Sequence, residues 1–140
     1  MCYRLVFASD RRLPTRRISE HVQVLPSDST PDVAQHFATG AHLVDIITVQ
    51  CACDLLYDPS KRGPRAAERL RRIHRDYSAI ADWAEEQLVQ RHRPLWMYLC
   101  WWSDFELPHR GTSIWNVDAL RAPDARLPER TLVEFITADT

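Results

Sequence analysis

Glycine is scarce in this 140-residue chain, which has only Gly40, Gly63 and Gly111, none of them near another. Loops that cradle phosphates need several glycines at short spacing, so the sequence argues against an ATP- or NAD-dependent enzyme. It also has no Gly-x-Ser-x-Gly and no His-Glu-x-x-His motif, the signatures of α/β-hydrolases and of zinc metalloproteases. We therefore predict no catalytic residue and no organic cofactor.

Long apolar runs are also lacking, because no stretch approaches the roughly 20 residues that cross a bilayer. The opening residues 1–5 show no basic region followed by an apolar run, so we expect no signal peptide, no membrane association and a cytoplasmic protein. Apolar residues make up 45% of the chain, enough for a core, and its length suits one domain over residues 1–140.

Net charge is nearly absent as well, at -1, but the charges are segregated along the chain. Residues 21–60 hold five aspartates and no Lys or Arg, whereas residues 61–75 hold seven Lys and Arg residues and only one acid, Glu68. Such a run is either the solvated face of a helix or an anion-binding site. The candidates for binding are Arg65, Arg69, Arg72 and Arg75. The low net charge gives little general attraction to a polyanion, so nucleic acid is not the expected partner.

Apolar periodicity predicts six strands, at residues 2–8, 21–25, 43–49, 95–102, 113–117 and 131–137. The run at 95–102 is apolar on both faces, which is typical of a central strand. A short helix is expected after Thr30-Pro31, ending near Gly40.

The longest predicted helix spans residues 64–91 and opens at Pro64. Its apolar stripe recurs at steps of three and four. The stripe comprises Ala66, Leu70, Ile73, Tyr77, Ile80, Ala81, Ala84 and Leu88. Arginines crowd its N-terminal half, while Asp82, Glu85 and Glu86 lie in the other half, the reverse of what the helix dipole favours. This reversal favours an anionic partner.

One long helix cannot connect so many strands in parallel, so several strands must pair through hairpins. We predict an α+β fold, with a mainly antiparallel sheet of four to six strands, the long helix packed on one face and one short helix.

Several short motifs carry a family resemblance. These are Met1-Cys2, Ala8-Ser9-Asp10 with Leu13-Pro14, Cys51-x-Cys53, and Cys100-Trp101 with Asp104. In these motifs the chain resembles a family of small bacterial proteins of uncharacterised function, whose central motif is Gly-Cys-Gly-Cys-Gly and whose distal strand carries Cys-Trp-x-x-Asp. The chain departs from it at Gln50, Ala52 and Asp54, where the family has glycines. The resemblance implies no activity, but it places all four cysteines on motif positions.

The four cysteines, Cys2, Cys51, Cys53 and Cys100, allow three interpretations. They are buried structural thiols, ligands of a soft metal such as zinc, or thiols for redox chemistry. Cys51 and Cys53 are two apart, so on a strand both side chains point the same way. The metal and redox interpretations require that segments distant in sequence bring the sulfurs together.

Two further features are candidates for function. Asp54, Asp104 and Glu106 follow apolar segments and form a candidate polar site, because acids at strand ends hold hard cations or transfer protons; the alternative is a polar loop. Five tryptophans are many for one small domain. Adjacent Trp101 and Trp102 must face opposite sides of a strand, which favours a homodimer because tryptophan is enriched at interfaces.

From these features we predict a non-enzymatic protein that works by interaction or oligomerisation. One alternative is a metal-binding or thiol-redox protein that uses the four cysteines. The other is an anion or nucleic-acid binder that uses the arginine-rich start of the long helix.

Overall fold

The computed structural model describes residues 2–28, 30–48, 52–56, 60–90 and 94–137. The strands are β1 (Tyr3–Ser9), β2 (Arg16–Arg17), β3 (Val22–Pro26), β4 (His42–Thr48), β5 (Leu95–Trp101), β6 (Gly111–Asn116) and β7 (Thr131–Ile136). The α-helices are α1 (Pro31–Ala34) and α2 (Pro64–Val89), and three 3₁₀ turns are η1 (Cys53–Leu55), η2 (Trp102–Asp104) and η3 (Val117–Arg121). In the described residues no helix is long and apolar enough to span a membrane.

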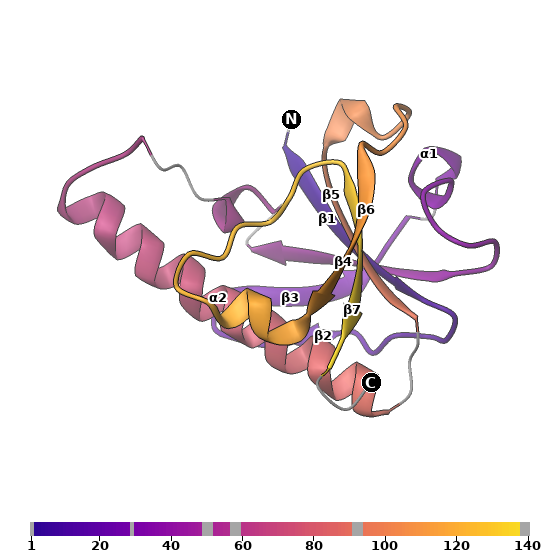
Figure 1. Cartoon of the computed structure of the whole chain (residues 1–140), viewed down its shortest axis with the longest axis horizontal. Coiled ribbons are helices and arrows are strands. Elements are labelled where there is room, and N and C mark those ends of the chain that lie inside the picture. Colours follow the sequence, from indigo (N-terminus) through magenta and orange to yellow (C-terminus); the bar gives the residue numbers. More distant parts are fainter. Residues whose placement is uncertain (1, 29, 49–51, 57–59, 91–93, 138–140) are drawn as a thin grey trace.

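The strands form one sheet in the order β2-β3-β4-β1-β5-β7-β6, against one face of which α2 lies (Figure 1). The predicted α+β class is confirmed, but the sheet has seven strands rather than four to six and is mixed. The missed strand, β2, is two exposed arginines on the sheet edge and carries no apolar pattern. The prediction also missed that β6 and β7 pair in parallel. They can run parallel because residues 117–130 leave the sheet and pass along α2 before β7 begins.

The main core lies between the sheet and α2. Leu5 and Phe7 alternate along β1 toward the helix, as predicted, and Val22 and Val24 do the same on β3. Opposite them, Tyr77, Ile80, Ala81, Trp83, Ala84 and Leu88 line the buried side of α2. The Tyr77 hydroxyl donates a hydrogen bond to the Leu55 carbonyl, which ties η1 to the helix.

A smaller core covers the opposite face of the sheet. Its buried members come from β1, β5 and the segments around α1 and η2, and they are Val6, Ala8, Val33, Phe37, Tyr98, Cys100 and Phe105. Val33 and Phe37 are therefore core residues, but α1 ends at Ala34, well before Gly40. Gly40 has φ +81°, a conformation that favours glycine, and it lies in a turn. The prediction that it ends the short helix was therefore wrong.

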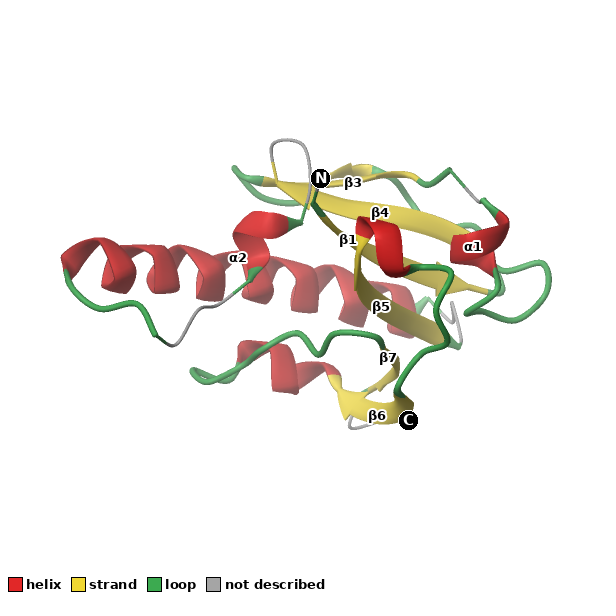
Figure 2. Cartoon of the chain, turned by 90° about the horizontal axis from the view of Figure 1, so that it is seen from above, coloured by secondary structure: helices red, strands yellow, loops and turns green. Residues whose placement is uncertain are grey.

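The helix α2 extends past the sheet. Its C-terminal half crosses the sheet, whereas its N-terminal end projects beyond the strands in both views (Figures 1 and 2). Buried helix residues begin at Ile73, and between Pro64 and Arg72 every residue is exposed or half-buried. We call residues 64–72 the projecting half of α2 and residues 73–89 its docked half.

Candidate functional site

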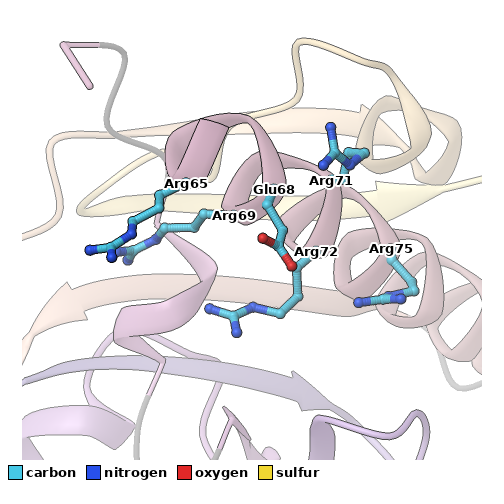
Figure 3. Close-up of a pocket in the computed structure, with 6 residues that line it drawn as sticks. All are labelled: Arg65, Glu68, Arg69, Arg71, Arg72 and Arg75. Carbon is cyan, nitrogen blue, oxygen red and sulfur yellow. The ribbon is translucent and has the colours of Figure 1, made fainter. Parts of the chain in front are cut away.

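The predicted basic cluster lies on and next to the projecting half of α2. The helix begins where Gly63 has φ +99° and Pro64 occupies the first turn, so the chain turns sharply into it. Six side chains line a surface cavity of about 540 Å³ there (Figure 3): Arg65, Glu68, Arg69, Arg71, Arg72 and Arg75. Arg65 and Arg69, one helical turn apart, extend in the same direction. The structure thus gathers all four predicted arginines and adds Arg71.

The arginine cluster is electrostatically unbalanced. Among the described residues, none of its five arginines makes an ion pair. Like charges one turn apart, as in Arg65 with Arg69 and Arg71 with Arg75, destabilise a helix, and cations near its N-terminus oppose the dipole. Folding alone therefore does not account for this arrangement.

The docked half of α2 differs in this respect. Arg121 of η3 forms ion pairs with Asp82 at 2.6 Å and Glu85 at 2.9 Å, and these bonds raise the pKa of Arg121. Arg16 of β2 pairs with Glu86. Asp82, Glu85 and Glu86 are thus paired with bases from elsewhere in the chain, whereas the arginines of the cluster make no ion pair with any described acid.

A second cavity, of about 810 Å³, lies between the projecting half of α2 and the chain around η1 and Gly63. We call it the α2–η1 groove. Its apolar lining is Leu56, Ala66, Leu70 and Ile73, and its basic lining includes Lys61, Arg65 and Arg69. Arg65 and Arg69 line both cavities, so the groove and the arginine cluster form one continuous surface. The sequence stripe did contain Ala66 and Leu70, but nothing in it showed that these two residues would line a groove.

Asp76 marks the border between the two halves of α2. It is only 2% exposed, and its Oδ1 has no hydrogen-bond partner among the residues that the structure describes. Burial raises the pKa of Asp76, and the negative charge of Asp54 raises it further, while His21, Arg75 and Arg72 oppose this rise. Since acids are usually placed on exposed helix positions, the sequence pattern gave no sign of this burial.

The described cysteines lie in three different environments. Cys53 lines the α2–η1 groove, and its Sγ accepts a hydrogen bond from the Tyr3 amide at 3.4 Å. Cys100 is buried in the smaller core on the other face, where burial raises the pKa of its thiol to about 11. Cys2 lines a cavity of about 150 Å³ beside Arg4 and Trp102. Cys51 lies outside the described residues.

Cys2 and Cys53 thus line separate cavities, and the described residues include no group of three His, Cys, Asp or Glu side chains that could hold a metal ion. A zinc or redox role for the cysteines stays a prediction, because Cys51 is not among these residues.

The predicted polar site is divided between two places. The Thr48 hydroxyl lies 3.4 Å from Asp54 Oδ2, and Asp54 acts on the pKa of Asp76 beneath α2. Asp104 lies in η2 and contributes to the raised pKa of Cys100 on the other side of the sheet. Glu106 is exposed and follows η2. In the part of the chain that the structure describes, no contact joins Asp54 to Asp104.

Sequence reasoning missed a partly buried ion pair on this second face. Arg4 Nη2 lies 3.0 Å from Asp45 Oδ2 and donates to Ser27 Oγ. The guanidinium also stacks between Trp102 and Phe105, at 5.4 and 5.5 Å from the ring centroids. Trp101 is the last residue of β5 and packs edge-on against Tyr3, whereas Trp102 is 55% exposed and lies in η2. The prediction that both tryptophans lie on one strand was therefore wrong for Trp102, because the strand ends before it.

Comparisons with protein families, with curated proteins and with solved structures found no match to this chain. The resemblance to the bacterial family therefore stays a prediction, and function has to be argued from the site itself.

Proposed function

We propose that this protein is a non-catalytic binding domain that contacts the anionic groups of a partner through the arginine cluster on α2. The observation that carries the proposal is the charge asymmetry of that helix. Arg65, Arg69 and Arg72 project from it without an ion pair to any residue that the structure describes, whereas Asp82, Glu85 and Glu86 of the docked half are matched by Arg16 and Arg121. A partner that brings acidic groups supplies the negative charge that the described part of the chain does not place there.

The position of the cluster also supports binding. The projecting half of α2 stands clear of the sheet, so its arginines are accessible along the helix (Figure 2). Guanidinium groups pair with carboxylates and phosphates through two parallel hydrogen bonds, which makes arginine well suited to such contacts. Arg65 to Arg72 spans seven residues, or roughly 10 Å at about 1.5 Å per residue, so several anionic groups can be contacted together.

The test is binding of fluorescent poly-glutamate by the whole protein at increasing salt. The test variant changes Arg65, Arg69, Arg72 and Arg75 to Gln. The matched control changes exposed Arg11, Arg12, Arg17 and Arg110 to Gln, which alters the net charge equally. We expect salt-sensitive binding that weakens about tenfold or more in the test variant, because each surface ion pair contributes up to about 1 kcal/mol.

The control should bind within about threefold of the unaltered protein, because it loses only nonspecific attraction. Equal weakening of both variants would show that net charge alone drives binding and would refute the proposed site. Absence of binding at low salt would refute it as well. Double-stranded DNA serves as a second probe; if it binds more tightly than poly-glutamate with the same dependence on the four arginines, the partner is a nucleic acid.

A further inference from the structure

The apolar stripe of α2 continues beyond the sheet. Ile73, Tyr77 and Ile80 are buried in the main core at steps of four and three. Leu70 and Ala66 extend the same series toward the N-terminus, and they line the α2–η1 groove half-exposed. Steps of four and three are the repeat by which one helix packs along another. The projecting half of α2 therefore carries a helix-packing stripe that the sheet does not cover.

The α2–η1 groove has the size and composition of a binding site. Its volume of about 810 Å³ lies within the range of roughly 300–1,000 Å³ that is typical of ligand sites. Leu56, in the chain after η1, lines the same groove as the stripe. An apolar floor with basic residues above it favours an occupant that is apolar on one side and acidic on the other.

We propose that the α2–η1 groove receives an acidic amphipathic helix of a partner protein. This inference rests on the proposed function and specifies the partner's chemistry. Apolar side chains of the partner, spaced three and four apart, pack on Ala66, Leu70 and Leu56, and its Asp and Glu residues flank them and pair with Arg65 and Arg69. The row of arginines over roughly 10 Å suits several carboxylates along a helix better than the single anionic head of a lipid.

A second copy of this chain is not the expected occupant. Its own projecting half would bring the seven Lys and Arg residues and one acid of residues 61–75 against the same bases. Like charges at an interface oppose association. Nucleic acid would pair with the arginines but would not cover the apolar residues of the groove. Single-stranded bases stack on aromatic rings, and the described lining of the groove has none.

The test uses two synthetic helical peptides of equal length and equal glutamate content, one with leucines at i, i+3 and i+7 and one with glutamines there. Binding to the whole protein is measured by fluorescence anisotropy. We expect the leucine peptide to bind about tenfold or more tightly, because its apolar side chains are removed from water in the groove. Leu70→Gln should abolish this preference without altering poly-glutamate binding.

The matched control is Val89→Gln, which replaces an apolar residue that is 73% exposed at the far end of the same helix. It should leave both peptides unchanged, and circular dichroism checks that each variant is folded. Leu70→Ala is a second, milder variant that should reduce the preference in part.

Each other outcome overturns the inference. If the two peptides bind equally and only the arginine variant loses this binding, the proposed function is supported but the groove does not bind a helix. Failure of both peptides and of poly-glutamate would refute the two proposals together. Displacement of the leucine peptide by micelle-free dodecanoate at equal concentration would identify a fatty acid as the occupant. Dimerisation of the protein that Leu70→Gln abolishes would identify a second copy.

Discussion

The two halves of α2 follow one apolar repeat but have different surroundings. In the docked half, the stripe is covered by the sheet and the acids Asp82, Glu85 and Glu86 are paired with Arg121 and Arg16. In the projecting half, the stripe lines an open groove and the arginines have no ion pair among the described residues. This difference shows that the docked half contributes to folding, whereas the projecting half holds apolar groups that line an open groove and arginines that no described acid pairs with.

The largest expected contrast is in stability. Ile80→Ala should lower the free energy of unfolding by about 2–5 kcal/mol, because it leaves a cavity between α2 and the sheet. Leu70→Ala should lower it by less than about 1 kcal/mol, since that side chain is half-exposed. Urea unfolding of both variants measures the difference. Similar losses would mean that the projecting half is as much a part of the core as the docked half.

A smaller contrast concerns the charges. Arg121→Gln removes ion pairs with Asp82, Glu85 and Asp118 and should cost about 1 kcal/mol at low salt, because exposed pairs contribute up to about 1 kcal/mol and share one guanidinium. Arg69→Gln should be neutral or slightly stabilising, since it relieves repulsion from Arg65. The two unfolding free energies are compared at low and high salt. A destabilising Arg69→Gln would indicate an internal partner for that arginine and contradict the proposed site.

The smallest effect on stability is expected for the buried Asp76, which lies where the projecting half of α2 meets the docked half. Its pKa is raised in the folded state, so the folded protein holds this proton more tightly than the unfolded chain. The stabilisation that the more tightly held proton of Asp76 gives the folded state is complete below the ordinary aspartate pKa. It is lost as pH rises through the raised pKa of Asp76. Asp76→Asn cannot titrate, so its stability relative to the unaltered protein should increase as pH rises over that window. Urea unfolding from pH 4 to 7 tests this, and a difference that stays constant with pH would show that Asp76 titrates normally.

Much of the fold could be predicted because it depends on local alternation. Tyr3, Leu5 and Phe7 alternate with Arg4 and Val6, and the structure places these two sets on opposite faces of β1. Proline after glycine predicted where α2 starts. β2 was missed, because two arginines on an edge carry no apolar signal, and so was the parallel pairing of β6 with β7, because strand direction depends on the path of the connection.

The residues of the candidate site could be predicted from the sequence, but their arrangement around a groove could not. Spacing along the helix was enough to identify Arg65, Arg69, Arg72 and Arg75 as one cluster. No local pattern showed that α2 would extend past the sheet, that Leu56 and Leu70 would line one groove, or that Cys53 and Cys100 would lie on different sides of the sheet. These placements depend on which distant segments pack together.

The amino-acid sequence by itself determined which residues of α2 share a face, where the helix begins and which half of it is basic, because a helix repeats every 3.6 residues whatever surrounds it. Only the tertiary structure decided which part of that face is covered. The helix extends past the sheet (Figure 1), so one part of the same stripe is in the core and the other is left open, beside arginines that pair with no acid in the described ranges.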